Sequence, residues 1–365
     1  MGRDGVTVQP EAVQDYLRAH VSPEARLVSL APLGAGLQED LKSYGYGRPL
    51  LVSWEQPRPE GVALRRAVLR TMAADPYGHD RRADRIAVLT EAFDDFPLIP
   101  RHVRPLDVGA FDSAGRLVPS ARGEPWLLTE FVEGELYAHE LAVHAVEDHA
   151  SQGAIDRAVA LANYLAELHA EKRSPEDHVR HVRDTVGSGE GIAGIADGWP
   201  HCHPVADEER LALIERAAVR FRWRLKAFTH RSRRIHGDFH PFNVLFRAGV
   251  EFSVLDASRR SAGDPADDVT CMAINYLFFA LRARGRFTGA ARELWDAFWT
   301  AYLGATNDRE LLRVVAPWFA WRALVVTSPV WYPDVPNAVR DRILIFVERL
   351  LSGAPFHPKE VDVLL

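Results

Sequence analysis

The pattern of hydrophobic and polar positions divides the chain near Gly134. Before it, Val- and Leu-rich runs at 26–33, 49–56 and 63–72 are separated by Gly and Pro, which predicts strands. Residues 80–96 place apolar side chains at helical spacing, and the run at 125–134 predicts one more strand. A short opening helix is predicted from Pro10, which suits a first helical position. The first third of the chain is therefore expected to be a compact, β-rich region.

After Gly134 the apolar residues follow a helical period. Residues 154–173 place one stripe of Ala and Leu side chains on a single face, as a core-facing helix does. The stretch 174–235 is polar and irregular except for a helix near 207–228, and its glycine-rich part at 187–200 predicts a mobile lid or a substrate-side loop. From 266 onward, helical patterns rich in Trp, Tyr and Phe predict buried helices.

This pattern predicts an α+β protein of two parts, residues 1–134 and 135–365. The net charge of −6 provides no basic field for a nucleic-acid backbone, so nucleic acid is not an expected partner. Two cysteines cannot form a disulfide framework, which favours a reducing, cytoplasmic location. No run approaches the roughly 18 apolar residues of a membrane span, and no membrane association is expected. The oligomeric state is left open.

The strongest chemical signal is HGDFHPFNVLF at 236–246, followed by FSVLDASRRSAGDPADDV at 252–269. A hairpin formed by the two apolar runs would bring Asn243 and Asp256 to the same end of its ladder. A carboxylate and an amide oxygen there suit Mg²⁺, which takes its remaining ligands from water and phosphates. Asp238 precedes Asn243 by five positions, the separation found in the protein-kinase catalytic loop, where the Asp accepts the proton of the attacking hydroxyl.

The ordered set of motif residues resembles the aminoglycoside phosphotransferase and choline kinase family, which has H-G-D-x-H-x-x-N, a strand ending in Asp, and then G-D-P and a nearby Asp. The matching residues are His236, Gly237, Asp238, His240, Asn243, Asp256, Gly263, Asp264, Pro265 and Asp268. The resemblance implies a bilobal, protein-kinase-like fold, in which a small β-rich lobe ends in a hinge strand and a larger lobe is mostly helical. It also implies that Asp238 is the catalytic residue, that Asn243 and Asp256 hold Mg²⁺, and that the γ-phosphate of ATP or GTP passes to a hydroxyl. We expect the two histidines, Asp264 and Asp268 to brace the loop.

The same resemblance assigns the nucleotide to the first lobe. Arg70, in AVLRTM, would contact the phosphates, although a solvated strand charge is the alternative. Asp84 is the nearer acidic partner for Arg70, and Glu91 is the second choice. The other implied contacts are Gly34 and Gly36 in the turn over the phosphates, and the carbonyl of Thr129 and the amide of Phe131 at the adenine edge.

Several alternatives remain at this level. A protein kinase is disfavoured because no A-P-E segment follows Asp256, and a catalytically silent nucleotide-binding regulator is disfavoured because the motif acids are intact. Residues 201–203, His-Cys-His, lack a second pair of zinc ligands and favour an exposed turn. The small-molecule acceptor is either an aminoglycoside-like antibiotic or a hydroxylated metabolite. The C-terminal acids that could match a polycation are Asp296, Asp308, Glu310, Asp334 and Asp341.

Overall fold

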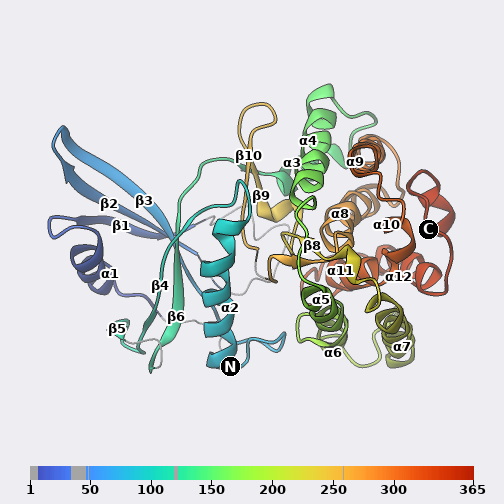
Figure 1. Ribbon diagram of the computed structural model, residues 1–365, viewed down its shortest axis with the longest axis horizontal. Helices are drawn as coiled ribbons and strands as arrows, with labels where there is room; N and C mark the ends of the chain where they lie inside the picture. Colours follow the sequence, from blue (N-terminus) through green and yellow to red (C-terminus); the bar gives the residue numbers. More distant parts are fainter. Residues whose placement is uncertain (1–6, 34–46, 48, 119–121, 258) are drawn as a thin grey trace. The chain divides into compact units, whose positions relative to one another are not determined.

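The computed structural model describes residues 7–33, 47, 49–118, 122–257 and 259–365 (Figure 1). It divides into two compact units. The first comprises residues 1–98 and 102–132, and the second comprises Ile99–Arg101 and residues 133–365. The sequence had placed this boundary after residue 134 and had not separated Ile99–Arg101. The α+β class is confirmed, because the first unit is built on a sheet and the second is mostly helical.

The first unit contains a six-stranded antiparallel sheet in the order β1-β2-β3-β6-β4-β5. The strands are β1 (Arg26–Pro32), β2 (Leu50–Arg58), β3 (Gly61–Thr71), β4 (Pro105–Phe111), β5 (Leu117–Val118) and β6 (Glu124–Glu130). Four of these strands were predicted, whereas β4 and β5 were not. In β4, Gly109 lies opposite Trp126, and a Cβ on Gly109 would lie 2.5 Å from the indole ring. This strand therefore has its glycine because of a contact across the sheet, which local sequence does not reveal.

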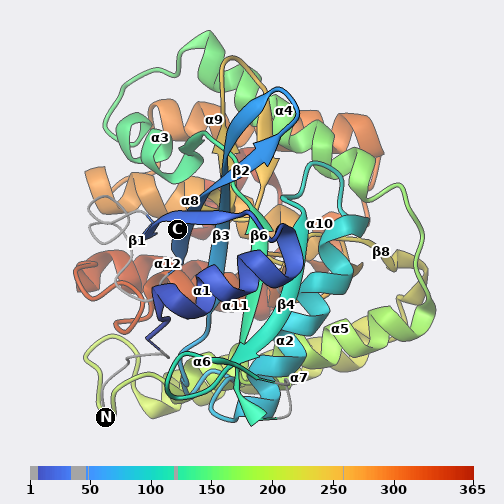
Figure 2. The ribbon, with the colours of Figure 1, turned by 90° about the vertical axis from the view of Figure 1, so that its left-hand side faces the viewer.

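Helices cover both faces of this sheet. Helix α1 (Pro10–Tyr16), continued by a π-helical turn at Leu17–Val21, lies on one face, and α2 (Arg82–Asp95) with the 3₁₀ turn Phe96–Leu98 lies on the other (Figures 1 and 2). The α1 side forms a core with Trp54, Leu69 and Trp126. On α2, the buried Arg85 makes two hydrogen bonds of 2.7 and 2.9 Å to the Glu124 carboxylate at the start of β6. Both predicted helices are confirmed.

The second unit is built around α8 (Ala266–Arg284), which is buried throughout residues 266–281 and packs against α9 (Ala290–Thr306) and α11 (Ala316–Thr327) (Figure 1). The other helices are α3 (Tyr137–His144), α4 (Gln152–Leu168), α5 (Pro175–Gly187), α6 (Ile192–Asp197), α7 (Glu208–Leu225), α9 (Ala290–Thr306), α10 (Leu311–Val314), α11 (Ala316–Thr327) and α12 (Asn337–Leu351). The short strands and 3₁₀ turns of this unit are β7 (Glu135–Leu136), β8 (Arg233–Arg234), β9 (Val244–Phe246), β10 (Phe252–Val254), β11 (Ala262–Gly263), Thr229–Arg231, Pro241–Asn243 and Pro358–Leu364.

The stretch 174–235 is more regular than the sequence suggested. It contains α5, α6 and α7, and α6 lies inside the glycine-rich segment that was predicted to be a lid or loop. Ile192 and Ile195 of α6 are buried. A Cβ on Gly194 would lie 1.9 Å from the Gly189 carbonyl oxygen, so this glycine is required by close backbone packing. The loop prediction was wrong for residues 192–197, because a glycine that permits close packing within a helix cannot be told from a loop glycine by sequence alone. Residues 188–191 are turns, and a role as a lid or substrate-side loop stays a prediction.

The aromatic residues after 290 form the core of the second unit, as predicted. Trp295, Trp299 and Trp318 are almost fully buried, and Phe319 packs against Trp295 and Trp299. Cys202 is exposed in a turn, in agreement with the expectation for residues 201–203. Within the described parts of the chain, every helix is too short or too polar to cross a bilayer.

Candidate active site

The segment 236–243 is held by a hairpin at its C-terminal side. Strands β9 and β10 pair with Val244 opposite Val254, so Asn243 and residues 255–256 lie at the same end of the ladder, as predicted. The backbone N–H of Leu255 donates to the Asn243 carbonyl at 2.9 Å. The Asn243 amide Nδ2 lies 3.4 Å from the Asp256 carbonyl oxygen. Local pairing thus brings the two predicted metal ligands together.

Asp238 is buried and its two carboxylate oxygens have different surroundings. Oδ1 lies 2.8 Å from Arg322 Nη1 and 2.5 Å from Arg259 Nη1. Oδ2 lies 3.4 Å from Asn243 Nδ2 and 3.4 Å from His240 Nε2. Both guanidinium contacts among the described residues therefore involve one oxygen, and the other oxygen faces the Asn243 side.

The charge of Asp238 is set by this environment. Burial by itself raises the pKa of the carboxyl group, but the positive charges of Arg259, His240 and Arg322 outweigh burial and hold the pKa well below its usual range. Asp238 is consequently an ionised hydrogen-bond acceptor at neutral pH. Such a group can orient a hydroxyl and accept its proton, which is the limited assistance that phosphoryl transfer requires.

Asn243 and Asp256 have the chemistry expected of a magnesium site. The Asn243 Nδ2 donates to the Asp238 carbonyl at 3.0 Å, which directs the amide oxygen away from that contact. Asp256 has a φ of 54°, a left-handed conformation that is uncommon for a residue other than glycine and that occurs often at functional sites. No group of three or more His, Cys, Asp or Glu side chains within the described ranges could hold a metal. One amide and one carboxylate fit Mg²⁺, which keeps several waters and binds substrate phosphates.

The predicted bracing of the loop is present. The buried Asp268 accepts hydrogen bonds from the backbone N–H groups of His236 and Gly237, at 2.7 and 2.8 Å, and from His169 Nε2 at 3.1 Å. His236 Nδ1 accepts from the Asp238 N–H at 3.3 Å, and His240 Nδ1 accepts from the Phe242 N–H at 3.1 Å. Because the ring nitrogens of these histidines accept hydrogen bonds from backbone amides, the histidines stabilise the conformation of the loop.

Comparison with protein-family models identifies the family of the chain. The model of the phosphotransferase enzyme family matches residues 60–313, which cover part of each unit and the whole motif set. The chain belongs to this family. It is a phosphotransferase that uses an alcohol group as acceptor, and the family resemblance seen in the sequence is confirmed.

Solved structures similar to this phosphotransferase have low sequence identity to it. An aminoglycoside phosphotransferase from Streptomyces rimosus, in complex with ADP and streptomycin, is 16% identical over 87% of this chain and 99% of that chain, with a TM-score of 0.49. A macrolide 2′-phosphotransferase from Brachybacterium faecium is 15% identical over 95% and 98%, with a TM-score of 0.44. A choline kinase from Streptococcus pneumoniae is 11% identical over 96% and 94%, with a TM-score of 0.45. A search of curated proteins finds no match.

Four residues around Asp238 were not predicted from the sequence. Arg322, on α11, and Arg259, after β10, contact the Asp238 carboxylate. The Glu190 carboxylate lies 3.4 Å from Arg259 Nε, and the Trp321 ring lies beneath the Arg322 guanidinium at 3.8 Å. One signal was available in the sequence, because Arg322 is the single charged residue in the apolar run 316–327. A charge in such a run requires a buried partner.

The acids of the C-terminal third do not gather into one site. Asp308 and Glu310 pair with Arg231, Asp341 pairs with Arg210, and Asp296 pairs with Arg292. These ion pairs involve three different arginines, and Asp334 is exposed. These residues therefore do not form the carboxylate lining that would match a polycation.

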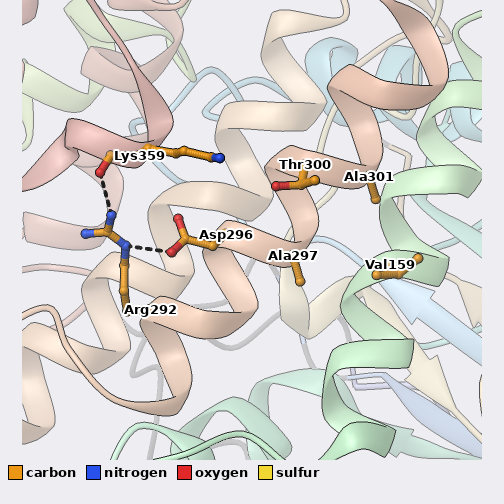
Figure 3. Close-up of a pocket in the computed structure, with 7 residues that line it drawn as sticks. All are labelled: Val159, Arg292, Asp296, Ala297, Thr300, Ala301 and Lys359. Carbon is orange, nitrogen blue, oxygen red and sulfur yellow. Dashed lines mark hydrogen bonds and ion pairs between the residues drawn. The ribbon is translucent and has the colours of Figure 1, made fainter.

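A surface hollow of about 650 Å³ lies on α4, α9 and the C-terminal 3₁₀ turn (Figure 3). Its walls include Arg292, Asp296 and Lys359, and the Arg292 side chain donates to the Lys359 carbonyl and to Asp296. None of its lining residues belongs to the 236–256 segment. The hollow is therefore separate from the 236–256 segment.

The residues predicted to bind nucleotide lie in the first unit or outside the described residues. Arg70 is a partly buried residue of β3 opposite Leu127, and Thr129 is a buried residue of β6. The Asp84 carboxylate accepts the Arg81 backbone N–H at 3.2 Å and caps α2, while its pairing with Arg70 stays a prediction. Phe131 follows β6, and its ring lies beneath the Arg66 guanidinium at 4.5 Å. Gly34 and Gly36 lie outside the described residues.

A buried ion pair between Arg231 and Asp264 holds the turn that precedes α8. Arg231 Nε and Nη2 lie 2.9 and 3.0 Å from the Asp264 carboxylate. Burial raises the pKa of Asp264, but the charge and hydrogen bonds of Arg231 outweigh it and lower the pKa below its unfolded value. The stabilisation is therefore complete above the unfolded pKa of about 3.9 and is lost as the pH falls through the lower, folded pKa. The free energy of unfolding, measured with urea from pH 7 to pH 2.5, should fall by this contribution. In Asp264→Asn the free energy of unfolding should depend less on pH over the same range. An equally steep loss in the variant would contradict this assignment.

Proposed function

We propose that this phosphotransferase transfers the γ-phosphoryl group of ATP or GTP to a hydroxyl of a small molecule, with Mg²⁺ as cofactor. The observation that supports the proposal is the buried, ionised Asp238, five residues before Asn243 and next to the β9–β10 hairpin, which Asp256 follows by two residues. Family membership supports the same reaction. A catalytically silent regulator would have no need for a carboxylate held in this way.

In this proposal Asp238 Oδ2 accepts a hydrogen bond from the acceptor hydroxyl and then its proton. The side-chain oxygens of Asn243 and Asp256 would hold Mg²⁺. When bound, the ion neutralises charge on the phosphate oxygens. The loop supplies orientation, because Asp268 fixes the backbone on one side of Asp238 and the hairpin fixes Asn243 on the other.

The first unit would bind the nucleotide. Arg70 would contact the phosphates, with Asp84 as its acidic partner, and Gly34 and Gly36 would allow close approach of the backbone to them. The carbonyl of Thr129 and the amide of Phe131 would bind the adenine edge. These assignments rest on the motif resemblance.

For the acceptor, we favour a hydroxylated metabolite over a polycationic antibiotic. Two arginines contact Asp238, and the nearby Glu190 already pairs with Arg259. A polyamine would have to approach these guanidinium groups, and the acids that could attract it pair with arginines elsewhere. Like charges at such short range are unfavourable in a partly buried site.

A panel assay tests the function and the acceptor together. The full chain with Mg²⁺ and either ATP or GTP is mixed with aminoglycosides, macrolides, choline-like amines, sugars and hydroxy acids, and nucleoside diphosphate release is measured with mass detection of the phosphorylated product. We expect product with a neutral or anionic alcohol. Phosphorylation of aminoglycosides alone would overturn the acceptor preference, and no product with any alcohol would overturn the function.

A metal prediction follows from Asn243. Asn243→Ala should raise the Mg²⁺ concentration for half-maximal rate by about tenfold or more, because a ligand is lost. The measurement is a Mg²⁺ titration of diphosphate release. Asn337→Ala, at the exposed start of α12, is a matched control that should leave the titration unchanged. An unaltered Mg²⁺ requirement in Asn243→Ala would remove this residue from the metal site.

A further inference from the structure

Arg322 connects the catalytic loop to the helical core of the second unit. Its Nη1 lies 2.8 Å from Asp238 Oδ1, and its Nη2 donates to the Gly237 carbonyl at 2.8 Å. On its other side, Nε donates to Asp267 Oδ1 at 3.0 Å, and Nη2 also contacts that oxygen. The side chain is only 5% exposed. One guanidinium thus joins α11, the start of α8 and the residue proposed as the base.

The far end of this connection is also fixed. Asp267 is fully buried, and its other oxygen, Oδ2, lies 3.1 Å from His181 Nε2 of α5. His181 Nδ1 accepts the Asp264 backbone N–H at 3.0 Å, and its ring stacks on Trp318 at 4.7 Å. The Arg322 guanidinium itself lies on the Trp321 ring. Arg322 therefore has a single orientation, determined by neighbours on α5, α8 and α11.

Stability alone does not explain a charge at this position. Burying a guanidinium has a large desolvation cost, and a buried ion pair is often no more stabilising than well-packed apolar residues of similar volume. The other residues of α11 are apolar except for the terminal Thr327. The arginine fixes the orientation of the carboxylate that it contacts, because its guanidinium is planar and its N–H groups have fixed directions. With Oδ1 held by Arg322 and Arg259, the carboxylate cannot rotate freely, and Oδ2 faces Asn243.

We propose that Arg322 is a positioning residue for catalysis, which holds the Asp238 carboxylate so that Oδ2 meets the acceptor hydroxyl. The inference rests on the proposed function, because it gives Asp238 the role of base. Arg322 does not contact substrate in this account and acts through Asp238 alone. Its loss should therefore reduce kcat and leave the nucleotide KM nearly unchanged.

The test compares Arg322→Met with a matched buried arginine. Arg340, on α12, is equally buried, and its partners among the described residues are the backbone carbonyls of Val335, Thr327, Tyr332 and Pro333. Turnover of Mg²⁺-ATP is measured with water and with the best alcohol of the panel as acceptor. We expect Arg322→Met to lower kcat by about 10²-fold, since misplacing a reacting group by about 1 Å has an effect of this size. Arg340→Met should lower the Tm with little change in kcat.

A double-mutant cycle with Asp238→Asn gives the decisive readout. If Arg322 acts through Asp238, Arg322→Met should lower kcat in the wild type and have almost no further effect in Asp238→Asn. Independent, multiplicative effects of the two substitutions would overturn the proposal. So would a wild-type kcat in Arg322→Met accompanied by a lowered Tm, because that result indicates a purely structural role.

A conservative variant covers the case in which Arg322→Met does not fold. Arg322→Lys keeps the charge, but one ammonium group cannot reach Asp238, the Gly237 carbonyl and Asp267 together. The kcat of Arg322→Lys should therefore lie between that of the wild type and that of Asp238→Asn. A wild-type kcat in Arg322→Lys would overturn the proposal. A wild-type protein that phosphorylates no alcohol and hydrolyses no nucleotide would instead overturn the proposed function, and this inference with it.

Discussion

Asp238→Asn should lower kcat by about 10³-fold, within the range that a positioned general base contributes to catalysis. Asparagine keeps the size of the side chain but removes the negative charge and the capacity to accept a proton. The fold should survive, because Arg322 retains Asp267 and Arg259 retains Glu190 as ion-pair partners. Steady-state diphosphate release measures kcat, and calorimetry measures nucleotide affinity, which should stay within a few-fold of the wild-type value.

A control substitution separates this effect from a general loss of charge. Asp341, on α12, is about half exposed and pairs with Arg210 in a different part of the second unit. Asp341→Asn removes the same charge and should leave kcat unchanged. An Asp238→Asn enzyme with wild-type kcat would show that another group accepts the proton, and the assignment of the catalytic loop would then be wrong.

Asp268→Asn should reduce the free energy of unfolding by about 3 kcal/mol, because it leaves a buried donor without an acceptor and removes a buried charge. In the wild type, the Asp268 carboxylate accepts hydrogen bonds from two backbone N–H groups and from His169. An amide has one acceptor oxygen, and its NH₂ group would face a backbone N–H. We also expect kcat to fall, since the same two N–H groups fix the backbone next to Asp238.

Urea unfolding measures the stability of this variant. Asp156→Asn, at an exposed position on α4, is the matched control and should change the free energy of unfolding by less than about 0.5 kcal/mol. If Asp268→Asn were as stable as the control, Asp268 would not be the anchor of the loop. A variant that is destabilised but retains its full kcat would show that the loop keeps its shape without this anchor.

Much of the geometry of the candidate site was predictable because it is local in the sequence. Asn243 and Asp256 flank a short hairpin, and the pairing of Val244 with Val254 follows from the alternation of apolar residues along two adjacent runs. The positions of β1, β2, β3 and β6, and of α2, α4 and α7, follow from similar periodicities. Strand β4 and helix α6 escaped prediction because each contains glycines whose purpose is a close contact, Gly109 with the Trp126 ring and Gly194 with the Gly189 backbone.

The sequence by itself determined the family, the ordered acid and amide residues around the hairpin, and the division into a β-rich and a helical part. Only the tertiary structure decided which charges surround Asp238. Arg322 lies 84 residues from Asp238 along the chain and reaches it because α11 packs against α8. Hairpin register depends on spacing between neighbouring residues, whereas a contact between distant segments depends on how whole helices pack, and spacing along the chain does not encode that packing.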